Sequence, residues 1–125
     1  MYEVMIKADF SAAHSLKEYG GKCEDLHGHN FKVDVYARAR KLNNIGLTID
    51  FRILKEKTRI ILAQLDHKYL NELPHFSERN PSSENIAAHI FRQLKNELND
   101  ENVVIKRVAV WESDSSCVSY EEGDN

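Results

Sequence analysis

Apolar and polar residues alternate with a period of two along the N-terminal part of the chain, a pattern typical of half-buried β-strands. The apolar side chains take the even positions over residues 4–14 and the odd positions over residues 29–40. Because successive side chains of a strand point to opposite faces, each run predicts one buried and one exposed face. A histidine stands at one end of each apolar row: His14 ends the first and His29 begins the second.

The apolar spacing becomes helical after a predicted turn at residues 41–47. Asp50 is a predicted N-cap, and the helix that follows it is expected to end near Asp66 and His67 or a little after. The predicted buried stripe of this helix is Phe51, Leu54, Ile61, Leu62 and Leu65.

A second helix is predicted after a loop that contains Pro74 and residues 80–83, where a serine serves as the N-cap. Its apolar stripe is Ile86, Ala87, Ile90, Phe91, Leu94 and Leu98. Residues 103–112 are rich in valine and predict a third strand, and residues 117–121 predict a short fourth strand after a turn.

The predicted order is therefore β-β-α-α-β-β in a single domain that spans residues 1–125. Strands in pairs around two helices favour an α+β domain, a four-stranded antiparallel sheet with both helices on one face. Antiparallel pairing of the first two strands would bring the end of one beside the start of the other. His14, His27 and His29 are thus expected to meet on the core face.

Charge and cysteine content limit the kinds of binding partner and the cellular compartment that we expect for this protein. The net charge of −3 and the pI of about 6.1 give no basic surface for nucleic acid. The N-terminal residues carry charges where a signal peptide would be apolar, and no apolar run is long enough to span a membrane. With two cysteines in the chain, no disulfide framework is indicated, so we expect a cytoplasmic protein.

Three converging imidazoles would suit zinc, which accepts imidazole nitrogen in tetrahedral geometry. Three protein ligands leave a fourth position for water or substrate, as in catalytic zinc sites. In the competing interpretation Cys23 is a fourth ligand and the site is structural. Cys23 is otherwise expected to be a reactive thiol next to a cation.

Two acidic positions have both functional and structural interpretations. Asp66 and His67 could form a carboxylate-oriented general base, or they could simply cap a helix end. Glu112 continues the parity of the buried valines of its strand, so it could bind a ligand with an amidine-like N–H pair, or it could lie at an exposed strand end. His75, His89 and Cys117 are interpreted as structural or surface residues.

Several separated motifs in order resemble the 6-pyruvoyltetrahydropterin synthase family over nearly the whole chain. The resemblance is strongest to the bacterial and archaeal 6-carboxytetrahydropterin synthase branch. The matching motifs are Phe10-Ser11-Ala12-Ala13-His14, Cys23-x-x-x-His27-Gly28-His29-Asn30-Phe31, Ile49-Asp50-Phe51, Leu65-Asp66-His67-Lys68-Tyr69-Leu70-Asn71, Asn80-Pro81-Ser82-Ser83-Glu84-Asn85 and Trp111-Glu112-Ser113.

The resemblance implies a tunnelling fold, in which the sheets of several subunits join into a barrel, commonly a homohexamer made of two trimers with active sites between subunits. It implies that Zn²⁺ is bound by the three histidines, that Cys23, Asp66 and His67 relay protons, and that Glu112 anchors the pterin ring. The implied substrate is 7,8-dihydroneopterin triphosphate. In the carboxy branch, which belongs to queuosine biosynthesis, triphosphate and acetaldehyde leave and 6-carboxy-5,6,7,8-tetrahydropterin remains.

Two other products stay open within the family. The three-residue spacer between Cys23 and His27 matches the carboxy branch, whereas the pyruvoyl branch usually has a longer spacer. Glu24 follows directly, and some relatives use a glutamate near this position to form 6-hydroxymethyl-dihydropterin for folate. A hypothesis of a different class is a non-catalytic binding domain that zinc stabilises.

Overall fold

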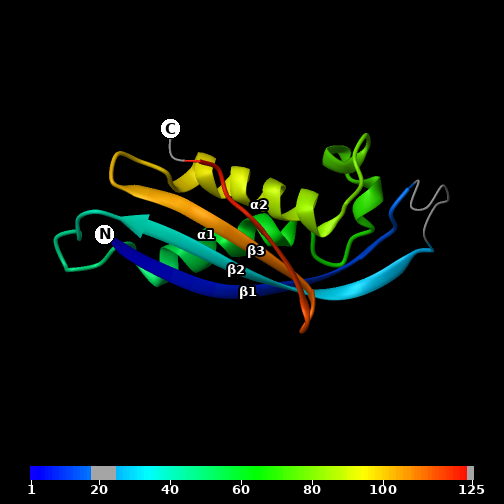
Figure 1. Cartoon of the computed structure of the whole chain (residues 1–125), viewed down its shortest axis with the longest axis horizontal. Coiled ribbons are helices and arrows are strands. Elements are labelled where there is room, and N and C mark those ends of the chain that lie inside the picture. Colours follow the sequence, from blue (N-terminus) through cyan, green and yellow to red (C-terminus); the bar gives the residue numbers. More distant parts are fainter. Residues whose placement is uncertain (18–24, 124–125) are drawn as a thin grey trace.

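Residues 1–17 and 25–123 are described by a computed structural model, in which a four-stranded antiparallel sheet carries two helices on one face (Figure 1). The strands lie in the order β1-β2-β3-β4, with bounds β1 (Tyr2–His14), β2 (His27–Ala39), β3 (Val103–Ser113) and β4 (Ser116–Tyr120). The helices are α1 (Phe51–Ala63) and α2 (Ser83–Leu98), and the short 3₁₀ helices η1 (Leu70–Glu72) and η2 (Pro74–Phe76) lie between them in sequence. The predicted β-β-α-α-β-β order is confirmed.

The hydrophobic core lies between the sheet and the helices. β1 and β2 pair along their whole length, from Tyr2 opposite Ala39 to His14 opposite His27. This register places the even residues of β1 and the odd residues of β2 on one face, and most of these side chains are buried as predicted. Because α1 packs against β1 and α2 against β3 and β4, the two helices close this face.

The helix α1 begins as predicted but ends earlier. Its N-cap is Asp50, whose carboxylate accepts the backbone N–H of Arg52 at 2.8 Å. The helix ends at Ala63, before the predicted end near Asp66 and His67. The backbone N–H of His67 donates instead to the carbonyl of Ser11 at 2.6 Å, which adds the following residues to the edge of β1 and prevents the helix from continuing.

Two residues differ from the predicted burial. Phe51 is exposed because it lies in the first turn of α1, whereas the later members of its predicted stripe are buried. Asp34 is buried although it lies on the sheet face that carries no helix. Its carboxylate accepts hydrogen bonds from Lys7 Nζ at 3.1 Å and Trp111 Nε1 at 3.0 Å, and these donors offset the cost of burying the charge.

The helix α2 begins where a capping serine was predicted. The Ser82 hydroxyl accepts the backbone N–H of Asn85 at 3.2 Å, and the predicted stripe from Ile86 to Leu94 is buried. Neither helix is long and apolar enough to cross a membrane, within the residues that the structure describes.

Candidate metal centre and active site

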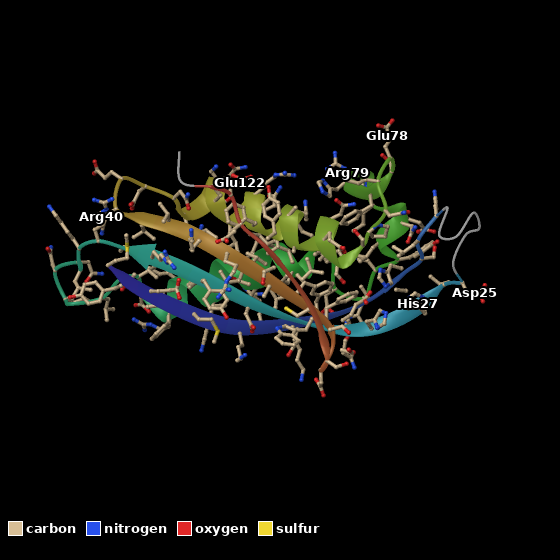
Figure 2. All side chains as sticks on the ribbon, in the orientation of Figure 1. Asp25, His27, Arg40, Glu78, Arg79 and Glu122 are labelled. Carbon is tan, nitrogen blue, oxygen red and sulfur yellow. The ribbon has the colours of Figure 1, made fainter. Side chains whose placement is uncertain are left out.

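Strand pairing brings the three predicted histidines together at one end of the sheet. His14 and His27 face each other as the last pair of β1 and β2, and His29 lies opposite Ala12, two residues further in. Figure 2 shows His27 and Asp25 at this end, with Arg40 at the other end of the sheet. The centroid of the His14 ring lies 4.7 Å from that of His27 and 5.1 Å from that of His29, and in both pairs the rings meet edge to face.

The ligand atoms of these histidines lie within 4.8 Å of one another, so the three side chains could hold a metal ion. Two backbone carbonyls orient two of the rings. His14 Nδ1 lies 2.7 Å from the oxygen of Pro81, and His27 Nδ1 lies 2.9 Å from the oxygen of Asp25. Because a carbonyl oxygen can only accept, each Nδ1 carries the hydrogen and the lone pair is left on Nε2.

The Nε2 atom of His14 is the strongest local sign that this site takes a cation. It is buried and has no hydrogen-bond partner among the described residues. A buried acceptor without a partner costs free energy that a bound metal ion would recover. The donor set of three imidazoles fits zinc, with one coordination position left open.

Glu112, near the end of β3, lies beside the same histidines. Its Oε1 atom is 3.4 Å from His14 Nε2 and 3.8 Å from His29 Nε2. Glu112 also lines a small cleft of about 190 Å³ with Ser83 and Cys117. The Glu112 carboxylate therefore borders both the histidine cluster and a pocket next to it.

Asp66 and His67 form a carboxylate–imidazole pair on the edge of β1. Asp66 Oδ2 lies 3.0 Å from His67 Nδ1, and Asp66 Oδ1 accepts the backbone N–H of Ser11 at 2.8 Å. The Ser11 N–H, followed by the His67 side chain, holds the pKa of Asp66 below its usual value. Asp66 therefore stays ionised and fixes the hydrogen of His67 on Nδ1, which leaves Nε2 able to accept a proton.

The backbone at His67 has an uncommon conformation for a residue with a side chain. Its φ angle is 57°, in the left-handed region, and its imidazole is 82% exposed. Such strain persists only where surrounding contacts impose it, and it is often found at functional sites. His67 and His29 line one hollow of about 500 Å³, so the pair lies at the same end of the sheet as the histidine cluster.

The loop before α2 contributes residues that sequence reasoning interpreted only as a loop and a helix cap. The Pro81 carbonyl orients His14, and the loop itself is held because Asn80 exchanges hydrogen bonds of 2.8 and 2.9 Å with the backbone of Lys17. The Ser83 hydroxyl is buried beside the small cleft and has no partner among the described residues. A capping pattern predicts neither role, because it does not show which loop packs against the strand ends.

Cys23 and Glu24 lie outside the described residues, so their predicted roles stay predictions. His75 and His89 lie apart from the three-histidine cluster, on η2 and α2, and stack on each other with ring centroids 3.9 Å apart. Cys117 is exposed, in agreement with its interpretation as a surface residue, and it also lines the small cleft.

The fold and this site define an α+β protein with a candidate metal centre at the end of its sheet. The sequence profile of the family described as 6-pyruvoyl tetrahydropterin synthase matches residues 3–123. The chain belongs to that family, and it is an enzyme of the tetrahydropterin synthase type.

Relatives within the family carry different names. A 6-carboxy-5,6,7,8-tetrahydropterin synthase of Synechocystis is 37% identical over 100 residues, covering 76% of each chain. A dihydroneopterin monophosphate aldolase of Pyrococcus furiosus is 32% identical over 118 residues, covering 94% of this chain and 96% of the relative. The solved structure of the Caenorhabditis elegans 6-pyruvoyl tetrahydropterin synthase superimposes with a TM-score of 0.81 at 25% identity, covering 98% of each chain. The predicted family and the predicted subunit fold, a four-stranded antiparallel sheet with two helices on one face, are confirmed.

Proposed function

We propose that this chain converts 7,8-dihydroneopterin triphosphate and one water into 6-carboxy-5,6,7,8-tetrahydropterin, acetaldehyde and triphosphate, as a step toward queuosine and related 7-deazapurines. The Synechocystis relative of that name supports this choice of reaction. The observation that carries the metal dependence is the buried Nε2 of His14, which has no hydrogen-bond partner among the described residues and lies next to the ligand atoms of His27 and His29.

In this proposal the three histidines hold Zn²⁺, which would act as a Lewis acid toward the side-chain hydroxyls of the substrate. His67 accepts a proton from the substrate side chain at Nε2, and Asp66 keeps the imidazole in the tautomer that permits this. Cys23 exchanges protons with the same side chain as a thiol or thiolate. These three residues perform the predicted proton relay.

The pterin ring is proposed to bind in the small cleft beside Glu112. The N–H pair at the amidine-like edge of the ring would donate to the Glu112 carboxylate, a charge-assisted pairing that gives both affinity and orientation. The buried hydroxyl of Ser83 offers a further hydrogen bond at the wall of the cleft. A ring in this position would place its side chain toward the histidine cluster.

We further propose that the working form is a homohexamer of two trimers with active sites between subunits, as the family resemblance implies. A cytoplasmic location is proposed with it, since the proposed role of Cys23 requires a reduced thiol.

A second candidate function is an aldolase that forms 6-hydroxymethyl-dihydropterin with Glu24 as a working residue. The relative from Pyrococcus furiosus favours it, because that protein is named an aldolase acting on dihydroneopterin monophosphate and aligns over most of both chains. The structural likeness to the Caenorhabditis elegans protein leaves a pyruvoyl product as a further alternative. A non-catalytic zinc-binding domain is the alternative of a different class.

Product identification separates these functions. Zinc-loaded protein is incubated with 7,8-dihydroneopterin triphosphate and, separately, with the monophosphate, and the products are identified by mass while acetaldehyde is assayed in parallel. Carboxytetrahydropterin with an equal amount of acetaldehyde supports the proposal. Hydroxymethyl-dihydropterin supports the aldolase, and a pyruvoyl product supports the third alternative. Zinc binding with no turnover supports the binding domain.

A further inference from the structure

Glu112 lies between the three-histidine cluster and the small cleft. Its side chain is 36% exposed, lines the small cleft with Ser83, and places Oε1 3.4 Å from His14 Nε2 and 3.8 Å from His29 Nε2. Both distances exceed those of ordinary hydrogen bonds, which lie near 3 Å. The carboxylate therefore approaches the imidazoles without a direct hydrogen bond to either.

Direct contact between these atoms is unfavourable without something positive between them. The Pro81 carbonyl holds the hydrogen of the neutral His14 imidazole on Nδ1, so in that form Nε2 presents a lone pair. The Glu112 oxygen also presents lone pairs, and two facing acceptors repel each other. A cation that both atoms can bind would remove this repulsion and satisfy the buried nitrogen.

The spacing agrees with that cation being a tetrahedral metal ion. Zinc–nitrogen and zinc–carboxylate bonds of about 2.0–2.1 Å place neighbouring ligand atoms roughly 3.3 Å apart in a tetrahedron. The distance of 3.4 Å from Glu112 to His14 is close to this value, and 3.8 Å to His29 needs only a small side-chain adjustment.

We propose that Glu112 is the fourth ligand of the metal when no substrate is present and leaves it to bind the pterin ring. The inference rests on the proposed function, which assigns the pterin N–H pair to the same carboxylate. When the N–H pair of the pterin ring holds the Glu112 carboxylate in the cleft, that carboxylate is no longer in position to bind the metal. Pterin binding and metal coordination by Glu112 therefore compete, and by linkage each weakens the other by the same factor.

Cobalt(II) in place of zinc makes this exchange visible, since its visible absorption reports the number and type of its ligands. The probe is unsubstituted pterin, which has the ring but no side-chain hydroxyls that could bind the metal. We expect pterin to change the cobalt spectrum of the wild-type protein. Glu112→Gln and Glu112→Ala are expected to change the resting spectrum, to abolish the response to pterin, and to weaken cobalt binding about tenfold or more in a chelator competition.

Two control variants separate this exchange from other causes. Cys23→Ala is expected to leave the resting cobalt spectrum unchanged. If Glu112 rather than Cys23 is the fourth ligand, the wild-type spectrum contains no thiolate charge-transfer band that this variant could lose. Ser83→Ala is expected to weaken the pterin response without altering the resting spectrum. Thermal melts of each variant check that the fold is intact. We expect the Glu112 variants to fold, because the Glu112 side chain is partly exposed.

The outcomes distinguish this inference from the proposed function. If cobalt binds and its spectrum is the same in the wild type and in both Glu112 variants, Glu112 is not a ligand and the inference is overturned, while the proposed reaction stands or falls by its products. A charge-transfer band lost in Cys23→Ala would make the thiol the fourth ligand and also overturn it. A protein that binds no cobalt at all would contradict the metal centre and the inference together.

Discussion

Histidines gather in two places in the described part of the chain, and the two groups differ in what surrounds the rings. In the cluster of His14, His27 and His29, backbone carbonyls hold two Nδ1 atoms and a carboxylate lies beside two Nε2 atoms. His75 and His89 instead stack with their ring planes tilted by 40°. The first group presents lone pairs to one point, whereas the second packs ring against ring.

Charge separates the two groups further. Burial, Arg79 and Arg92 lower the pKa of His75, and burial followed by the neighbouring His75 lowers the pKa of His89 to about 4. A cation is therefore unfavourable at the stacked pair, while the Glu112 carboxylate favours one at the cluster. The comparison shows that the oriented acceptors around a histidine, more than the residue type, decide whether it suits a metal.

The largest expected effect is on metal binding. His27→Ala should reduce the metal content of the purified protein from one ion per chain to nearly none, with affinity lower by about 100-fold or more because a ligand is lost. His75→Ala is the matched control and should retain full metal content. Elemental analysis after dialysis against a weak chelator measures both. Equal loss in the two variants would contradict the distinction between the groups.

A large effect is also expected on turnover when the orienting carboxylate is changed. Asp66→Asn should lower kcat about 10²- to 10⁴-fold, because the amide does not hold the same His67 tautomer in place. Metal content and melting temperature should change little, since Asp66 is only partly buried, His67 is exposed, and both lie outside the metal cluster. Steady-state kinetics with a metal assay on the same sample measure this, and an unchanged kcat would exclude the pair from the proton relay.

The stacked pair predicts acid sensitivity of the fold. The pKa of His89 is lower in the folded chain than its ordinary value of 6.5, so the unfolded chain takes up the proton more readily. The contribution of a neutral His89 is thus complete above pH 6.5 and is lost as the pH falls toward 4, amounting to about 3 kcal/mol. His75, whose pKa is also lowered, adds to the same loss.

The variant His89→Leu tests this prediction, since leucine keeps an apolar side chain in α2 without a titrating group. Urea unfolding at a series of pH values between 7.5 and 4 should show a smaller decrease in the free energy of unfolding than for the wild type. Parallel curves for wild type and His89→Leu would show that the stacked pair does not cause the sensitivity.

The smallest expected effect concerns the arginine beside the pair. Arg79→Gln should raise the pKa of His75 slightly toward its ordinary value, because one of the two cations that lower it is removed. An NMR titration of the His75 ring protons measures this change. A His75 pKa that falls in the variant would contradict the assigned cause.

Much of the fold could be predicted from the sequence because its patterns are local. The period of two assigned the apolar side chains of β1 and β2 to the buried face. The predicted caps, Asp50 and a serine within residues 80–83, indicated where the two helices begin. The end of α1 was less predictable. It depends on a hydrogen bond from His67 to the distant Ser11, which no local pattern encodes.

The candidate site was predictable to the extent that strand register determines it. His14, His27 and His29 end or begin apolar rows, so antiparallel pairing was enough to predict that they meet. The roles of the Pro81 carbonyl and the buried Ser83 hydroxyl depend on how the loop before α2 packs against the strand ends. Such loop packing is a tertiary property that residue spacing does not contain.

The most direct test of the central claim compares product formation before and after removal of the metal. One sample of the protein is stripped with a chelator, and half is reloaded with one equivalent of zinc. Each sample is then incubated with 7,8-dihydroneopterin triphosphate, and the pterin product and acetaldehyde are quantified. We predict equal amounts of carboxytetrahydropterin and acetaldehyde with zinc and neither without it. Undiminished product in the stripped protein would contradict a reaction that depends on the three-histidine centre.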